Sequence, residues 1–259
     1  MGVYSYYDEY LEELPTQAML INGHAIEHQL AGYRTLMSDG RGLVAPNITS
    51  TSVPKHDGKI YQSSNYQERQ IKVKFALTAN TSRDFREKLD RLNQLLSQPE
   101  QEISFNDQPE FAYNATLSDI TEEQKGWHTM VGTITLTASN PYKHRVLPVE
   151  NKGVGSIQIM EPIFYAVNPE KIVVTVEKAV ADIKISNGRQ TISISGNITA
   201  GELVIKPTGG DDFLTINGVA KPELLDWMSD LENFEIKSLD TVTVTPSLPI
   251  NVVIRSKRL

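Results

Sequence analysis

Two histidines and a glutamate stand at a spacing that zinc hydrolases use. The run His24-Ala25-Ile26-Glu27-His28 matches the pattern H-x-x-E-H, in which two histidines one helical turn apart bind zinc. That chemistry needs a helix here and a third ligand downstream. The preceding Asn22-Gly23 is typical of a tight hairpin turn that enters a strand. In a strand the two imidazoles would lie about 14 Å apart, too far for one zinc ion to bridge, so we predict no metal site.

No other grouping of polar side chains points to catalysis. The remaining histidines, at positions 56, 128 and 144, are scattered, and the sequence has no serine-hydrolase elbow, phosphate-binding loop or dinucleotide-binding glycine pattern. The pair Glu122-Glu123 falls in an expected polar turn before Gly126, where we interpret it as part of a solvated loop. A glycosidase would need two carboxylates that face each other across a cleft, and no such pair stands out. The sequence therefore predicts no catalytic residues, no cofactor and no enzyme activity.

The two tryptophans could serve another chemistry, the stacking of a sugar ring on an aromatic face. Trp127 follows Gly126 at the expected start of a strand, and Trp227 lies in the segment Leu224–Met228. Large aromatic side chains also pack in cores and at subunit interfaces. We favour core or interface packing for both.

The composition is that of an acidic protein with little affinity for nucleic acid or membranes. The 259 residues carry a formal net charge of -7 and include no cysteine, which excludes disulfides and thiol chemistry. Phosphate contacts need clustered lysines and arginines, and only residues 255–259 look basic. No apolar run approaches the roughly 18 residues of a membrane-spanning helix. We predict neither specific nucleic-acid binding nor membrane insertion.

The elements that would position these side chains are clearest between residues 69 and 142. Gln70–Leu77 alternates apolar and polar residues, which predicts a half-buried strand. The period then changes to that of a helix, after a hydroxyl N-cap at Thr81 or Ser82. The apolar stripe consists of Phe85, Leu89, Leu92, Leu95 and Leu96. We expect a helix at residues 82–97 that packs this stripe on a sheet, because a lone helix of this length would be marginal in water.

Other segments of the first half predict short strands and one long polar excursion. Alternation at residues 102–105, 111–117 and 127–138 indicates further strands, and Met19–Ile26 indicates a hairpin. Ala45–Tyr66 is polar and rich in Ser and Thr, and we expect a long loop or β-arm with an interfacial role. Residues 1–18 are acidic with interleaved tyrosines, and form either a frayed extension or a tail that orders against a neighbouring subunit.

A second β region follows a change in amino-acid composition near residue 148. Pro148, Asn151, Gly153 and Gly155 indicate a linker, and Leu224–Leu231 is expected to add one or two helical turns. Many short strands separated by turn residues predict a sandwich over residues 148–259. The strand candidates are residues 157–165, 171–177, 181–186, 190–195, 202–207, 213–216, 242–244 and 250–255.

Taken together, the features between residues 69 and 142 resemble the N-terminal half of the distal tail proteins of siphophages. Their order and spacing carry the resemblance, which extends more loosely from about Met19 to the C-terminus. The features are Arg69-x-Ile71-x-Val73-x-Phe75, a capped helix ending Leu95-Leu96, Ile103-x-Phe105 before an Asp-x-Pro turn, Gly132-Thr-Ile-Thr-Leu-Thr, and Asn140-Pro141-Tyr142.

The resemblance implies a mainly β fold with two β-sandwich domains. Residues 19–147 would form a tail-tube-like domain flanked by the helix, and residues 148–259 a galectin-like or carbohydrate-module-like sandwich. It also implies a virion structural protein, made in the host cytoplasm, whose N-terminal domain closes into a hexameric ring at the tail tip. The ring would occur singly or as two stacked rings. The implied partners are the tail tube protein, the tail-hub or tail-associated protein and, through the C-terminal domain, receptor-binding proteins.

The competing hypothesis is a carbohydrate-binding module or adhesin that engages cell-wall sugars through the C-terminal sandwich. Residues 146–259 hold no histidine and few arginines. The polar cassette that galectins use for a galactoside is therefore missing, and the fold resemblance does not carry sugar binding with it.

Overall fold

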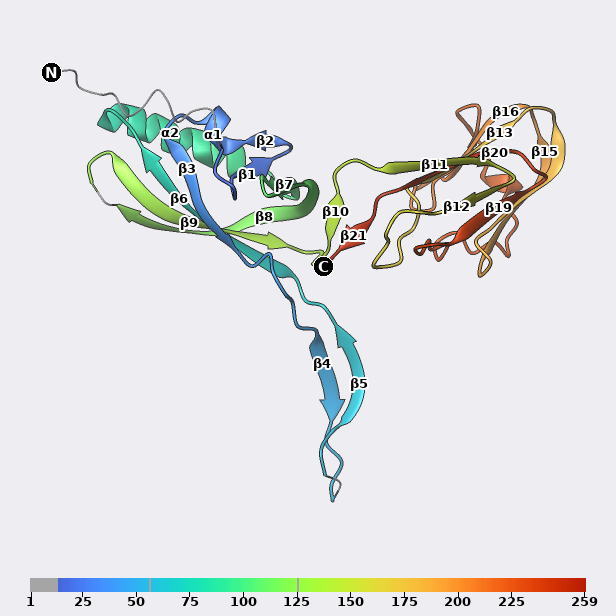
Figure 1. Ribbon diagram of the computed structural model, residues 1–259, viewed down its shortest axis with the longest axis horizontal. Helices are drawn as coiled ribbons and strands as arrows, with labels where there is room; N and C mark the ends of the chain where they lie inside the picture. Colours follow the sequence, from blue (N-terminus) through green and yellow to red (C-terminus); the bar gives the residue numbers. More distant parts are fainter. Residues whose placement is uncertain (1–13, 56, 125) are drawn as a thin grey trace. The chain divides into compact units, whose positions relative to one another are not determined.

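The computed structural model describes residues 14–55, 57–124 and 126–259, and the chain divides into two compact units. Unit 1 runs as far as residue 143, and unit 2 comprises residues 144–258. The fold is mainly β, which confirms the predicted fold class (Figure 1). Of the acidic extension predicted at residues 1–18, residues 1–13 lie outside the described part of the chain.

Unit 1 is built on one antiparallel sheet with strands in the order β2-β1-β7-β8-β9-β6-β3. Its helices are α1 (Ile26–Gln29) and α2 (Ser82–Leu96). Its strands are β1 (Met19–Ile21), β2 (His24–Ala25), β3 (Tyr33–Asp39), β4 (Asn47–Thr51), β5 (Ile60–Asn65), β6 (Arg69–Thr78), β7 (Gln101–Phe105), β8 (Gln108–Gln124) and β9 (Thr129–Ala138). β4 and β5 form a separate two-stranded sheet.

The helix predicted from the apolar stripe forms as α2 and covers one face of this sheet (Figure 1). It begins after Thr81, whose Oγ1 accepts a hydrogen bond from the backbone N–H of Asp84 at 3.1 Å. Phe85, Leu92 and Leu96 are buried, in one apolar cluster with the inward side chains of β6. Burial of this stripe supplies the stability that a helix of 15 residues lacks by itself.

The predicted hairpin at Met19–Ile26 forms, but the strand expected over His24–His28 does not. Asn22 and Gly23 have φ values of 51° and 80°, which fit the type I′ turn that joins β1 to β2. β2 ends at Ala25 and the short helix α1 follows. Ile26 is fully buried there. The expectation of a strand was wrong because burying Ile26 in the core turns the chain before a longer strand can form.

β8 is longer than the sequence indicated and contains the Glu122-Glu123 pair. It spans 17 residues, and its last part pairs with β9, with Glu122 opposite Gly132. The polar turn expected at Glu122 was therefore wrong, since β9 offers a full-length partner to this stretch. The turn lies nearer Trp127, and β9 begins at Thr129. Only glycine fits at position 132, because a Cβ there would lie 2.7 Å from the ring of Phe75.

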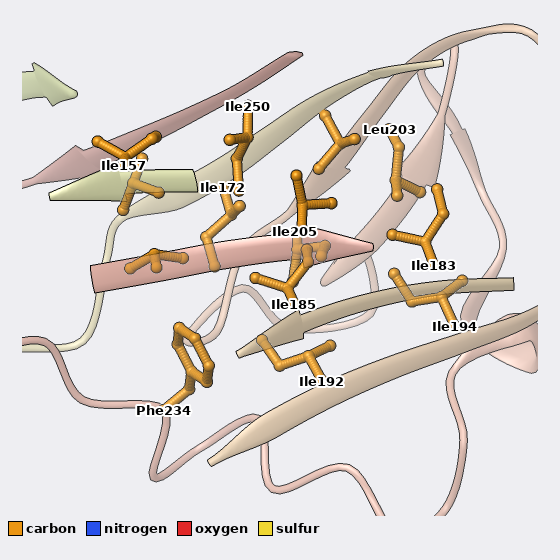
Figure 2. Packing of buried hydrophobic residues seen from close by; sticks show 14 of the residues in the cluster. Ile157, Ile172, Ile183, Ile185, Ile192, Ile194, Leu203, Ile205, Phe234 and Ile250 are labelled. Carbon is orange, nitrogen blue, oxygen red and sulfur yellow. The ribbon is translucent and has the colours of Figure 1, made fainter. Parts of the chain in front are cut away.

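Unit 2 is a ten-stranded antiparallel arrangement in the order β15-β14-β19-β12-β11-β20-β13-β16-β17-β18. Its strands are β11 (Val149–Val154), β12 (Ser156–Gln158), β13 (Lys171–Val176), β14 (Val180–Ser186), β15 (Thr191–Ile198), β16 (Gly201–Ile205), β17 (Leu214–Ile216), β18 (Val219–Ala220), β19 (Thr241–Thr245) and β20 (Pro249–Ile254). A short pair joins β10 (Lys143–Arg145), which starts at the last residue of unit 1, to β21 (Lys257–Arg258). The core is aliphatic with Phe234 fully buried in it (Figure 2).

Two local expectations for unit 2 are corrected by its strands. The linker expected at residues 147–155 contains β11, which pairs with β20 over six residues. Its glycines are there for a tight turn: Gly155 has a φ of 73°, and a Cβ on Gly153 would lie 2.7 Å from the carbonyl oxygen of Ser156. The helical turns expected at Leu224–Leu231 reduce to a 3-10 turn at Pro222–Leu224. The strand expected over residues 157–165 is limited to β12.

Candidate functional site

The H-x-x-E-H motif is split between two elements, and its glutamate has a structural contact. His24 on β2 and His28 on α1 are exposed. One carboxylate oxygen of Glu27, Oε1, accepts a hydrogen bond from the backbone N–H of Thr35 at 2.8 Å. Within the described residues, no group of three or more histidines and carboxylates is placed to hold a metal ion. The absence of a bound metal stays a prediction, whereas the strand from which it was argued is replaced by α1.

The other candidate residues are dispersed over the surface. Glu122 is exposed on β8, and the ring of His128 lies near Ser82 Oγ at 3.4 Å. His56 lies outside the described residues. Trp127 and Trp227 are 85% and 90% exposed, so the suggestion of core packing was wrong for both. Their role at an interface stays a prediction.

The most distinctive surface of unit 1 is a protruding hairpin, here called the arm, made of β4, β5 and the loop between them (residues 47–65). Its strands pair only with each other among the described residues, and almost every residue is exposed. Ile48, Ile60 and Tyr61 are 60%, 51% and 60% exposed. The sequence expectation of a loop or β-arm at Ala45–Tyr66 is thus confirmed as a β-arm (Figure 1). A two-stranded hairpin is marginal by itself in water, so contact with a further surface would stabilise the arm.

Two arginines fix the root of the arm to the sheet. Arg69, only 3% exposed, donates from Nη1 to the carbonyl oxygens of Gly40 and Gly42 at 2.9 and 3.2 Å, and from Nε to that of Pro141 at 3.1 Å. Arg41 forms a bidentate ion pair with Asp107 and stacks on the ring of Phe105, 4.1 Å from its centroid. The chain therefore leaves β3 and returns into β6 through a fixed base.

The electrostatics of this base favour the charged state of its carboxylate. The hydrogen bonds from Arg41 hold the pKa of Asp107 below its usual range. Nearby, Lys143 Nζ donates to Gln108 Oε1 at 2.9 Å. The arginines of the base were missed in the sequence. The available signal was Arg69, which stands in the inward phase of the alternating strand, two residues before Ile71.

Unit 2 presents a groove of about 710 Å³, whose lining includes Leu225 and Ser229 on either side of Trp227 in the sequence. Its lining includes the apolar side chains of Phe213, Leu225 and Leu231 and the acidic residues Asp230 and Glu232. The neighbouring Trp227 and Met228 are 90% and 74% exposed. A groove of this size, with exposed apolar residues nearby in the sequence, is a candidate docking surface for a ligand or a protein segment.

Comparisons with known proteins identify one matching family model and several similar structures. Residues 28–138 match the family model described as the phage tail protein RIFT-related domain. The Dit (gp 19.1) protein of phage SPP1, described as a paradigm of the hub adsorption apparatus in phages that infect Gram-positive hosts, has a TM-score of 0.80 at 17% identity. The match covers 95% of this chain and 100% of that one. No curated protein matches the sequence.

Chains from two structures of the phage p2 baseplate in its activated conformation are more distant relatives in fold. The structure with Ca gives a TM-score of 0.51 at 11% identity, with 88% of this chain and 91% of that chain covered. The structure with Sr gives 0.54 at 12% identity, with 95% and 99% covered. In the described part of the chain, no helix is both long and apolar enough to cross a membrane. Residues 28–138 thus match a phage tail protein domain, and the chain shares the fold of the Dit protein of phage SPP1, in agreement with the resemblance of the sequence features to siphophage distal tail proteins.

Proposed function

We propose that the protein is a structural component of a siphophage tail tip, a distal tail protein whose copies close into a hexameric ring. The ring joins the tail tube to the tail hub, in a phage or prophage of a Gram-positive host. The RIFT-related domain and the fold shared with the Dit protein of phage SPP1 support this assignment. The protein would be made in the host cytoplasm and end in the virion, with no catalytic role.

The observation that carries the proposal is the arm. An exposed two-stranded hairpin on a fixed base has little to bury within its own chain. A protrusion that contacts a different surface on the next copy makes a head-to-tail contact, and head-to-tail contacts close into rings. Unit 2 remains available for receptor-binding proteins, through the groove and the exposed Trp227.

The mass of the full-length, tag-free protein tests the proposal. A chain of 28.9 kDa should elute and scatter light as a hexamer, or as two stacked hexamers. A variant in which a Gly-Ser turn replaces residues 47–65 should be monomeric but folded by circular dichroism. A wild-type protein that stays monomeric at concentrations well above those in an assembling cell would contradict the ring.

A second candidate function is the binding of a cell-wall sugar in the groove of unit 2. The exposed Trp227 could stack on a sugar ring while Asp230 and Glu232 accept hydrogen bonds from its hydroxyl groups. Calorimetric titration with purified cell-wall polysaccharide would detect it, and Trp227→Ala should abolish the signal. Trp127→Ala, equally exposed but on unit 1, is the matched control.

A further inference from the structure

The sheet of unit 1 ends at β3, and side chains and a loop cap the outer edge of this strand. The backbone N–H of Thr35 donates to Glu27 Oε1 at 2.8 Å, and that of Ser38 donates to Gln17 Oε1 at 2.7 Å. The N–H of Tyr33 donates to the carbonyl oxygen of Leu30. Donors occupied in this way cannot pair with an added strand. At the other end of the sheet, β2 has only two residues.

One long edge remains within the sheet, along the second half of β8. β7 pairs with β8 only as far as Ala115, whereas β9 pairs with it from Thr116 to Gln124. β8 has one further strand partner, β10, whose Lys143 contacts Gln108 at the start of β8. On the side opposite β9, no strand pairs with residues 116–124 in the described part of the chain. A bulge interrupts the ladder between Leu117 and Asp119, so the regular stretch is Asp119–Gln124. A straight, unpaired edge of this length is a template for another strand.

The arm offers a matching strand. The register of β4 with β5 shifts between Thr49 and Ser50 and leaves Gln62 of β5 without an opposite residue. A bulge bends the strand that carries it, so β4 is the more regular outer edge of the arm. β4 has five residues, close to the length of the regular part of β8.

The charges beside the two edges are of opposite sign. Asp119 and Glu122 are exposed on β8, while Lys55 and Lys59 are exposed at the tip of the arm. Both lysines lie outside β4, in the loop that joins it to β5, so they would attract the carboxylates over a distance and form no direct pair with them. The like charges of two β8 edges disfavour pairing of β8 with itself.

We infer that β4 of one copy adds as a strand to residues Asp119–Gln124 of β8 in the next copy, and that this pairing holds the ring together. The inference rests on the proposed ring and names the surface that the arm binds. Backbone hydrogen bonds supply the attraction in such strand addition, which suits a polar strand that has little apolar area to bury.

The absence of cysteine from the chain makes disulfide crosslinking a direct test in the full-length protein. One cysteine replaces the exposed Thr121 of β8, and a second replaces Ile48 or Thr49 of β4. Because a disulfide needs Cα atoms within about 7 Å, only paired strands will crosslink efficiently. Mild oxidation should give a ladder of linked chains up to the hexamer in at least one double variant. Each single variant should give dimers at most.

The control places the first cysteine on the capped edge, as Met37→Cys, with the same arm cysteines. Met37 is 50% exposed, so it is as reachable as Thr121 but should give no ladder. A wild-type ring whose arm crosslinks to position 37, or to neither strand, would overturn the inference and leave the proposed function standing. A monomeric wild type would overturn both.

A charge exchange tests separately whether the arm approaches this part of β8. The double variant Asp119→Lys, Glu122→Lys should raise the concentration at which the hexamer dissociates several-fold. Adding Lys55→Glu and Lys59→Glu to the same chain should restore the stability of the hexamer. Failure of the second pair to restore the hexamer would show that the arm tip does not face β8.

Discussion

The two units differ in how far the edges of their sheets are covered by other parts of the chain. In unit 2, the edge strand β15 is covered by the segment that follows the 3-10 turn: Asp226 N–H donates to the carbonyl oxygen of Ser193 at 2.9 Å, and Ser193 N–H donates to Ser229 Oγ at 2.8 Å. The strand at the other end, β18, has two residues. In unit 1, by contrast, half of β8 and both outer edges of the arm have no strand partner among the described residues.

This difference separates a unit that is complete within its own chain from one that needs a neighbour. Covered and short edges are how natural sheets avoid association, so unit 2 has the features of a monomeric module. Unit 1, in contrast, leaves strand edges uncovered, which is expected of a sheet that associates with another chain. We therefore expect changes in unit 1 to affect assembly, and changes in unit 2 to affect only its own stability.

The largest expected effect comes from Leu92→Asp in α2. Leu92 is 3% exposed, and a carboxylate buried there without a partner costs several kcal/mol, roughly the stability of a domain. We expect loss of soluble hexamer. Asn93→Asp, next to it and exposed, is the matched control and should assemble normally. Equal solubility of the two variants would show that α2 does not pack on the sheet.

Lys88 would be a poor control for this experiment, although it lies outside the apolar stripe of α2. Its Nζ donates to the carbonyl oxygen of Thr78 at 3.0 Å and lies 3.1 Å from Asp84 Oδ2. The lysine therefore ties the start of α2 to the end of β6. Lys88→Asp should therefore not be neutral, since the reversed charge would face that carbonyl.

The matching change in unit 2 is Phe234→Ala, which should destabilise that unit and leave the ring intact. Phe234 is fully buried in the aliphatic core (Figure 2), and loss of its ring costs about 3–5 kcal/mol. Calorimetry should show a lower melting temperature for one transition, while light scattering still reports a hexamer. Dissociation of the hexamer by this substitution would remove the distinction between the units.

Local periodicity was enough to predict α2 and the alternating strand β6, because both present one apolar face to a core. It failed where a distant partner decides the outcome. β11 has the asparagine and glycines of a linker, yet it becomes a strand because β20, about a hundred residues later, pairs with it. Glu122 is polar, as many turn residues are, yet it belongs to β8 because this stretch pairs with β9.

The candidate surfaces also include one that the sequence predicts and others that depend on distant contacts. The arm could be predicted, since a long polar stretch between strands cannot be buried. Its arginine base could not, because Arg41 finds Asp107 and Arg69 finds Pro141 only once the sheet has formed. The unpaired half of β8 could not be predicted either, because whether a strand has a free edge depends on the order of the strands in the folded sheet.

A smaller effect than core disruption should follow from Arg69→Ala at the base of the arm. Arg69 is the buried donor for three carbonyl groups, and hydrogen bonds from a charged group contribute about 1.5–3 kcal/mol each before relaxation and water entry offset part of the loss. Unit 1 should melt at a lower temperature, and the arm should become sensitive to protease. Arg34→Ala, an exposed arginine on β3, should change neither. Identical digestion of both variants would show that the base does not hold the arm.

The smallest expected effect is a dependence of stability on pH below about pH 4, to which one partly buried, arginine-paired carboxylate contributes in each unit. Ion pairs with Arg41 and Arg189 lower the pKa of Asp107 and of Asp240. A carboxyl whose pKa is lower in the folded state stabilises that state above its unfolded pKa of about 3.9, and the contribution is lost as the pH falls through the folded value. Asp107→Asn should therefore flatten the acid dependence of the unit 1 transition alone, and Asp240→Asn that of unit 2 alone. Melting temperatures of both transitions between pH 2 and 6, about the range that brackets the titration, would measure it. Both substitutions acting on both transitions would mean that the two units unfold as one.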